Sequence, residues 1–241
     1  MSIPLIIYTL IGFIVALGYF MNKYPVLVFV GQIINLAYTL VHEFAHAFVA
    51  VLVEQRVAEM RLNFDTSGHV MSYVKDNRDG LLVTFAGYTL PCVISLVLYM
   101  LLEAGRASFV LFILIGITGF SLVFIRNWYG FLWIAGFIAL LVTVYLYTTP
   151  TVIEHMAMFL SAVILAGSVY GGWRVFMYSM KHPEDAGDAT NLAQRTFLPA
   201  QVWGFIFFMI SVITFVAVPF YFYGSALMDV RYIEEIKLLL R

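Results

Sequence analysis

The sequence predicts an all-α polytopic membrane protein with about seven transmembrane helices and one short β-hairpin. Of its 241 residues, 63% are hydrophobic and 11% are charged, and the mean hydropathy is +0.95. A soluble domain carries about twice that share of charged residues. The apolar residues also gather in runs that are long enough to cross about 30 Å of hydrocarbon. Between two of these runs, the pattern changes to the two-residue alternation of a strand.

Seven apolar runs are candidate transmembrane spans, and their boundaries are soft by several residues. They cover approximately residues 3–20, 26–53, 81–102, 107–125, 128–147, 152–180 and 197–223. Only Arg126 and Asn127 separate the fourth run from the fifth, so these two runs form either a tight helical hairpin or one broken span. The first run lacks both a basic n-region and a small-residue cleavage site, so we expect a retained span and not a signal peptide.

We interpret residues 1–241 as a single integral membrane domain with a core at about 26–148. In the tail at about 226–241, apolar and charged residues recur at helical spacing. This tail is either an amphipathic helix on the membrane surface or a packing helix. Cys92 is the sole cysteine, which excludes a disulfide framework within the chain, and the net charge of −1 indicates no nucleic-acid partner. The expected partner from composition is the lipid bilayer.

The distribution of basic residues predicts which side of the membrane each loop faces. If all seven runs cross, the loops after the second, fourth and sixth runs lie on one face together with the N-terminus. That face holds eight of the 13 basic residues. The positive-inside rule therefore places it in the cytoplasm.

Residues 57–74 predict a β-hairpin. Apolar and polar residues alternate at 60–65, Asp65-Thr66-Ser67-Gly68 supplies turn chemistry, and residues 69–74 resume an extended pattern. Because open strand edges cannot face lipid, the hairpin must lie at the interface or line a wet cavity. Its edge either accepts an unfolded substrate as an added strand, or the hairpin is a solvated connector.

The stretch His42-Glu43-Phe44-Ala45-His46 has the spacing of a zinc site. Two imidazoles at positions i and i+4 share one helix face and can bind one Zn²⁺ ion, and Glu43 can take a proton from zinc-bound water. The alternative is a pair of helix histidines that are hydrogen-bonded to their neighbours. Since these histidines fall in the second half of the second run, we expect the site to lie nearer the cytoplasmic face.

These features together resemble the site-2 protease family of intramembrane zinc metalloproteases. The resemblance covers roughly residues 36–131: the HExxH motif inside a span, an extended hairpin after it, and then Phe-Ala-Gly-Tyr-Thr-Leu-Pro at 85–91. It implies a zinc cofactor and a transmembrane protein as substrate. In the family, an Asp on a later span is the third zinc ligand, but that region reads Arg126-Asn127-Trp128-Tyr129-Gly130, with Tyr129 at the place of the Asp. The chain therefore resembles a divergent branch with an RNxxG-type motif.

Another residue must supply the third ligand if Tyr129 does not. Glu154 and His155 are chemically suitable, but they begin the sixth run on the opposite side of the membrane. Asp188 lies in the loop after that run, on the same side as the histidines, and we predict it as the ligand, with Asp185 as the weaker candidate. The alternative role for Asp188 is the N-cap of a short helix at 188–193.

Two further side chains lie at the boundary of the fifth run. Asn127 is predicted to bind the substrate by orienting its carbonyl, or to coordinate zinc weakly through the amide oxygen. Arg126 is expected to be a snorkelling anchor.

The predicted function is that of a zinc-dependent intramembrane metallopeptidase. His42, His46 and Asp188 would hold the zinc, and Glu43 would be the general base that activates the water. A catalytically inactive relative that binds and regulates other membrane proteins is the main alternative, because Tyr129 replaces the expected Asp. A transporter or channel is disfavoured, since the runs contain few internal charges besides Glu43 and lack paired broken segments.

Overall fold

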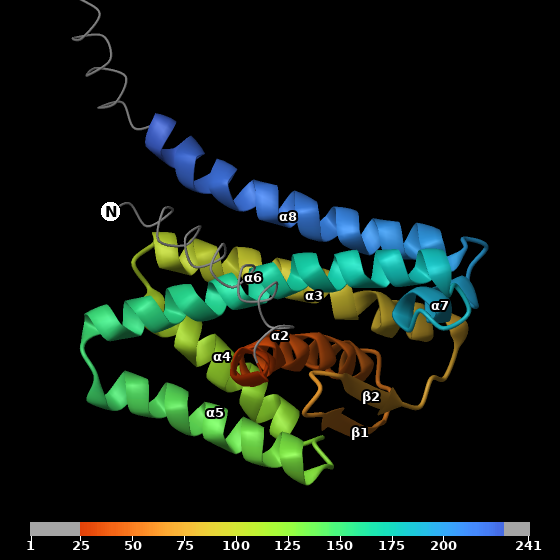
Figure 1. The fold of residues 1–241 in the computed structure, drawn as a ribbon, viewed down its shortest axis with the longest axis horizontal. Helices are drawn as coiled ribbons and strands as arrows, with labels where there is room; N and C mark the ends of the chain where they lie inside the picture. Colours follow the sequence, from red (N-terminus) through yellow and green to blue (C-terminus); the bar gives the residue numbers. More distant parts are fainter. Residues whose placement is uncertain (1–24, 229–241) are drawn as a thin grey trace, which may run out of the picture.

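A computed structural model describes residues 25–228, with side chains for residue 32 and residues 35–218. The predicted span at 3–20 and nearly all of the predicted tail helix at 226–241 lie outside these residues. Seven helices and one hairpin make up the described part of the chain (Figure 1). In order they are α2 (Pro25–Leu52), β1 (Val57–Leu62), β2 (Gly68–Ser72), α3 (Asn77–Glu103), α4 (Ala107–Leu122), α5 (Trp128–Tyr147), α6 (Pro150–Lys181), α7 (Asp188–Ala193) and α8 (Ala200–Met228).

Four of the described helices are long and apolar enough to cross a membrane: α3, α5, α6 and the Ala200–Val218 part of α8. The prediction of about seven spans is therefore supported only in part. The predicted span at 107–125 is shorter than expected, because α4 has 16 residues. At 1.5 Å per residue it is about 24 Å long, less than the hydrocarbon thickness of about 30 Å. The last residues of that run have left the helix and pair with β1.

Local capping residues explain where several helices begin and end. The Asp76 carboxylate accepts a hydrogen bond from the Asp79 amide at 2.8 Å and so caps α3. Thr149 caps α6, and Pro150 follows at its first position, where a missing N–H removes no helix bond. At the end of α3, Gly105 has a φ of 69°, a left-handed conformation that favours glycine and turns the chain toward α4.

Helix α2 lies at the centre of the bundle and packs against α3, α4, α6 and both strands (Figure 1). Small side chains permit this close packing, since Ala45, Ala47 and Ala50 are fully buried. The hairpin and α7 lie at the same end of the molecule, on either side of α2 and α3 in Figure 1. This arrangement brings segments from opposite halves of the sequence to one end of α2.

The predicted hairpin is confirmed. β1 and β2 are antiparallel, with Met60 opposite Val70 and Leu62 opposite Gly68, and the register shifts between Val57 and Glu59. In the turn, the Asp65 carboxylate accepts hydrogen bonds from the hydroxyl and the amide of Ser67, at 2.6 and 3.0 Å, and these bonds hold the pKa of Asp65 below its usual range. The turn chemistry predicted at 65–68 therefore acts through an Asx-type turn.

Candidate metal centre

Three potential ligand atoms converge beside α2. The Nε2 atoms of His42 and His46 lie 3.2 Å apart, because the two residues occupy successive turns on one face of the helix. The Oδ2 atom of Asp188 lies 3.4 Å from His42 Nε2 and 3.1 Å from His46 Nε2. Within the described part of the chain, these residues form a group of His and carboxylate side chains that could hold a metal ion.

The spacing of these atoms fits a tetrahedral zinc site. With zinc–ligand bonds of about 2.0 to 2.1 Å, adjacent ligands of a tetrahedron lie about 3.3 to 3.4 Å apart. The three separations in the structure are 3.1, 3.2 and 3.4 Å. Three such atoms occupy one face of a tetrahedron and leave a fourth position free, as catalytic zinc sites do. The donor set of two imidazoles and one carboxylate also suits zinc.

A second hydrogen bond prepares His46 for metal binding. Its Nδ1 atom lies 2.8 Å from the Val83 carbonyl oxygen of α3, and because a carbonyl only accepts, Nδ1 carries the proton. In the neutral imidazole, Nε2 then presents its lone pair to the site. The Nδ1 atom of His42 is buried without a hydrogen-bond partner among the described residues. The two imidazoles are thus held differently, His46 by α3 and His42 by packing.

The position of Asp188 depends on the fold of the segment that carries it. The predicted short helix at 188–193 is present as α7, but its N-cap is Gly187 and not Asp188, which is the first helical residue. Thr190 Oγ1 accepts a hydrogen bond from the Ala186 amide at 2.7 Å and donates one to the Pro183 carbonyl at 2.8 Å, which ties α7 to the preceding loop. These contacts direct the Asp188 carboxylate toward α2.

The electrostatic setting of Asp188 favours its ionised form. Its side chain is 17% exposed, and this burial raises the pKa. In their protonated form, before a metal binds, the two facing imidazoles lower the pKa by more, so that the pKa of Asp188 lies well below its usual range. An ionised carboxylate is the form that binds a metal cation.

Glu43 lies beside the ligand group and next to β2. The residue is only 4% exposed. A Cβ atom placed on Gly68 would lie 2.6 Å from Glu43 Oε1, so the absence of a side chain at the start of β2 leaves room for this carboxylate. Backbone atoms of the hairpin therefore lie next to the Glu43 side chain. An extended peptide that lay along β2 would also be close to this carboxylate.

Two cavities meet at this point. One, of about 520 Å³, extends along β2 and is lined by all three ligand residues. The other, of about 410 Å³, lies between α2, α6 and the loop before α7. Six residues line both cavities: His42, Glu43, Gly68, Tyr88, Ala186 and Gly187. Open space thus extends on both sides of Glu43 and His42.

Helix α3 contributes two residues whose roles the sequence did not indicate. The Tyr88 ring contacts the His42 ring edge-on, with centroids 4.8 Å apart, and stacks on Phe207 of α8 at 4.4 Å. A side chain on Gly87 would collide with both imidazoles. The segment Phe-Ala-Gly-Tyr at 85–88 therefore forms the wall of the centre. The signal for this in the sequence was the resemblance of residues 85–91 to the family's motif, which gave no contact for Gly87 or Tyr88.

The other predicted candidates lie elsewhere. Glu154 and His155 are exposed at the start of α6, whereas α7 follows the end of that helix. Asp185 lines the second cavity but does not belong to the ligand group. Asn127 pairs with the backbone of Leu62 in β1, and its predicted substrate contact stays a prediction.

Comparison with known proteins identifies the family of the chain. The family described as Peptidase M50B-like matches residues 10–218, which is most of the chain. The chain therefore belongs to this family of site-2 protease type, and the resemblance recognised in the sequence is confirmed. No curated protein and no solved structure matches the chain.

Proposed function

We propose that this chain is a zinc-dependent intramembrane metallopeptidase that hydrolyses peptide bonds of membrane-protein substrates. The observation that carries the proposal is the tetrahedral spacing of His42, His46 and Asp188 next to the buried Glu43. Asp188 supplies the carboxylate that the family places where Tyr129 stands. Membership of a peptidase family and the apolar helices support the same reading.

Each residue of the site has a separate role in this reaction. His42, His46 and Asp188 would hold a zinc ion, which when bound would supply polarisation of the scissile carbonyl and a lower pKa for the attacking water. Glu43 takes a proton from the water molecule while the oxygen of the water attacks the carbonyl carbon. The C–N bond then breaks, and Glu43 returns the proton to the leaving amine. His46 keeps its orientation through the bond to Val83 during these steps.

The substrate of this reaction would be an extended segment of a transmembrane protein. A helix hides its peptide carbonyls in hydrogen bonds, so the segment must unwind before cleavage. The outer edge of β2 offers it backbone partners beside Glu43, since β1 and β2 form a two-stranded sheet within the described residues. The excess of basic residues in the loops on this side supports a site nearer the cytoplasmic face.

Glu43→Gln tests the proposal, because this variant keeps the size of the side chain and removes the base. Purified wild type and variant should carry equal zinc, measured by mass spectrometry of the metal. Only wild type should cleave a reconstituted pool of single-span transmembrane peptides, with a loss in the variant of at least about 100-fold. Wild type that binds zinc and cleaves no peptide in the pool would favour the inactive, regulatory relative.

A further inference from the structure

The stretch at 126–130, the RNxxG motif, does not contribute to the ligand group but lies along the outer edge of β1. The Met60 amide donates a hydrogen bond to the Phe124 carbonyl at 2.8 Å, and the Arg126 amide donates to the Met60 carbonyl at 3.0 Å. Met60 and Ile125 thereby form a parallel bridge. The loop between α4 and α5 thus pairs with the outer edge of β1 through one parallel β-bridge.

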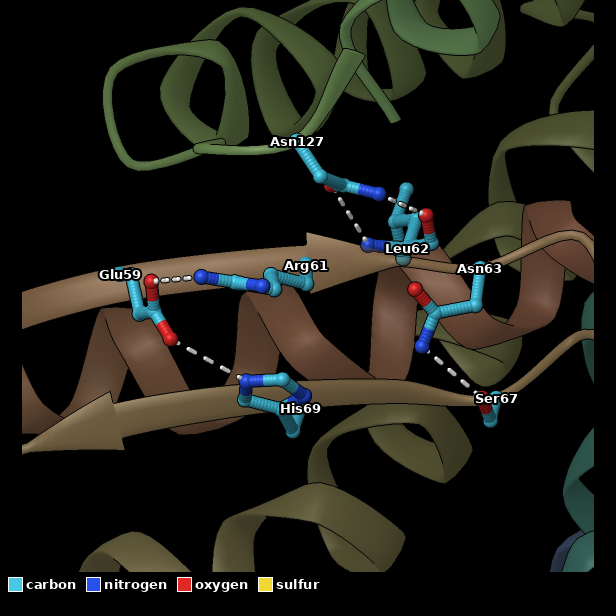
Figure 2. A network of polar contacts seen from close by, with 7 residues as sticks. All are labelled: Glu59, Arg61, Leu62, Asn63, Ser67, His69 and Asn127. Atoms are coloured by element: carbon cyan, nitrogen blue, oxygen red, sulfur yellow. Dashed lines mark hydrogen bonds and ion pairs between the residues drawn. The ribbon is translucent and has the colours of Figure 1, made fainter. Parts of the chain in front are cut away.

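The side chain of Asn127 continues this pairing where the backbone has turned into α5. Its Oδ1 atom accepts a hydrogen bond from the Leu62 amide at 3.3 Å, and its Nδ2 atom donates to the Leu62 carbonyl at 2.6 Å (Figure 2). A carboxamide carries one acceptor and one donor group, like a peptide unit, and so can replace one in a ladder. A carboxylate or a hydroxyl would not match both backbone groups equally well.

The other residues of the motif make this contact possible. A Cβ atom on Gly130 would lie 2.6 Å from Asn127 Oδ1, so glycine leaves the space that the carboxamide occupies. Arg126 Nη1 donates hydrogen bonds to the carbonyls of Val123 and Ile125, both at 2.9 Å. These bonds give partners to carbonyl groups that directly follow α4. Arg126 therefore has a defined local role beyond that of the predicted anchor.

We infer that the RNxxG motif is a clamp that fixes the hairpin, and that Asn127 is a positioning residue for the substrate edge. With the outer edge of β1 paired to 124–127, β2 presents the unpaired edge of the sheet among the described residues. That edge borders the larger cavity, and its first residue, Gly68, lies against Glu43. The catalytic consequence rests on the proposed function, whereas the clamp itself does not.

Asn127→Leu tests the clamp in the full-length protein, because it keeps the approximate size of the side chain and removes both hydrogen bonds. Amide hydrogen exchange of peptides that contain Leu62 should become about 10-fold faster or more. Zinc content should stay at the wild-type level. Asn63→Leu is the matched control, since the Asn63 side chain bonds the Ser67 hydroxyl at the turn of the same hairpin and not the Leu62 backbone (Figure 2). It should leave exchange at Leu62 unchanged.

Gly130→Ala provides a second route to the same result, because the added methyl group displaces the Asn127 carboxamide without altering it. Asn127→Asp keeps the acceptor and loses the donor, so its effect should be intermediate. Unchanged exchange at Leu62 in both Asn127→Leu and Gly130→Ala would overturn the clamp. This arm of the experiment gives its answer whether or not the protein cleaves peptides.

Kinetics separate positioning from general damage to the fold. For the peptide of the pool that wild type cuts fastest, Asn127→Leu should raise KM by roughly 2-fold or more at unchanged kcat, because the binding edge is no longer held in place. A loss of folded protein would lower the apparent kcat at constant KM. Faster exchange at Leu62 with an unchanged KM would overturn the positioning role, and absence of cleavage by wild type would count against the proposed function alone.

Discussion

The histidines and Asp188 of the candidate metal centre are positioned by different parts of the fold. His42 and His46 come from adjacent turns of one long buried helix, so their separation is fixed by the helix itself. Asp188 comes from α7, a helix of six residues that depends on contacts with α3, α6 and α8 and on the Thr190 hydrogen bonds. One half of the centre is therefore set by the helix that carries it, and the other half by tertiary structure. The two halves should respond differently to substitution.

The largest effect on zinc binding should come from substitution of a histidine of α2. Wild type is expected to bind about one zinc per chain, and His46→Ala should lose most of it, because two remaining ligands hold zinc weakly. Metal analysis of the purified proteins measures this. His155→Ala, at the exposed start of α6, is the control and should keep the metal. Equal zinc in wild type and His46→Ala would refute the centre.

A smaller effect on zinc binding is expected from substitution of Asp188 on α7. Asp188→Asn removes the charge and keeps the shape, so zinc affinity should fall by roughly 10- to 100-fold or more. Competition with a chelator measures the affinity. Asp185→Asn is matched in chemistry and lies three residues earlier, outside the ligand group, and should change the affinity little. If the two variants behaved alike, Asp188 would not be a ligand.

The smallest effect should come from the contacts that hold α7. Thr190→Val is close to isosteric and removes the bonds to Ala186 and Pro183 without touching a ligand. Each lost bond is worth about 1 kcal/mol, so we expect zinc affinity to fall roughly 5- to 30-fold if α7 is loosened. Thr214→Val on α8 loses the bond to the Ile210 carbonyl and the contact with the Cys92 thiol, neither of which involves α7, and should leave the affinity unchanged. A wild-type affinity in Thr190→Val would show that α7 holds Asp188 without these bonds.

Features that depend on neighbours in the sequence could be predicted. The HExxH pair follows from helical spacing, and the hairpin followed from alternation around the turn at 65–68. The end of α4 could not be predicted, because apolar character continues to Ile125 while the backbone there pairs with Met60. Hydropathy does not distinguish a buried strand from the end of a span.

Long-range contacts set the limit for the site as well. Asp188 was selected by elimination and by its side of the membrane, and nothing in its local sequence distinguishes a ligand from a helix cap. The pairing of Asn127 with Leu62 joins residues that are separated by two helices, α3 and α4. A side chain that mimics a peptide group leaves no periodic signal. The sequence therefore showed that Asn127 is a polar residue between two apolar runs, but it did not show which residue Asn127 contacts.

The remote origin of Asp188 has a consequence for the stability of the whole molecule. An ion shared between α2 and α7 would act as a cross-link that closes the intervening chain into a loop. By linkage, each tenfold rise in free zinc above the dissociation constant would add about 1.4 kcal/mol to the free energy of unfolding. Without zinc, α7 and the segment before it would be held to α2 only by the contacts of the protein itself, so removal of zinc should lower the free energy of unfolding.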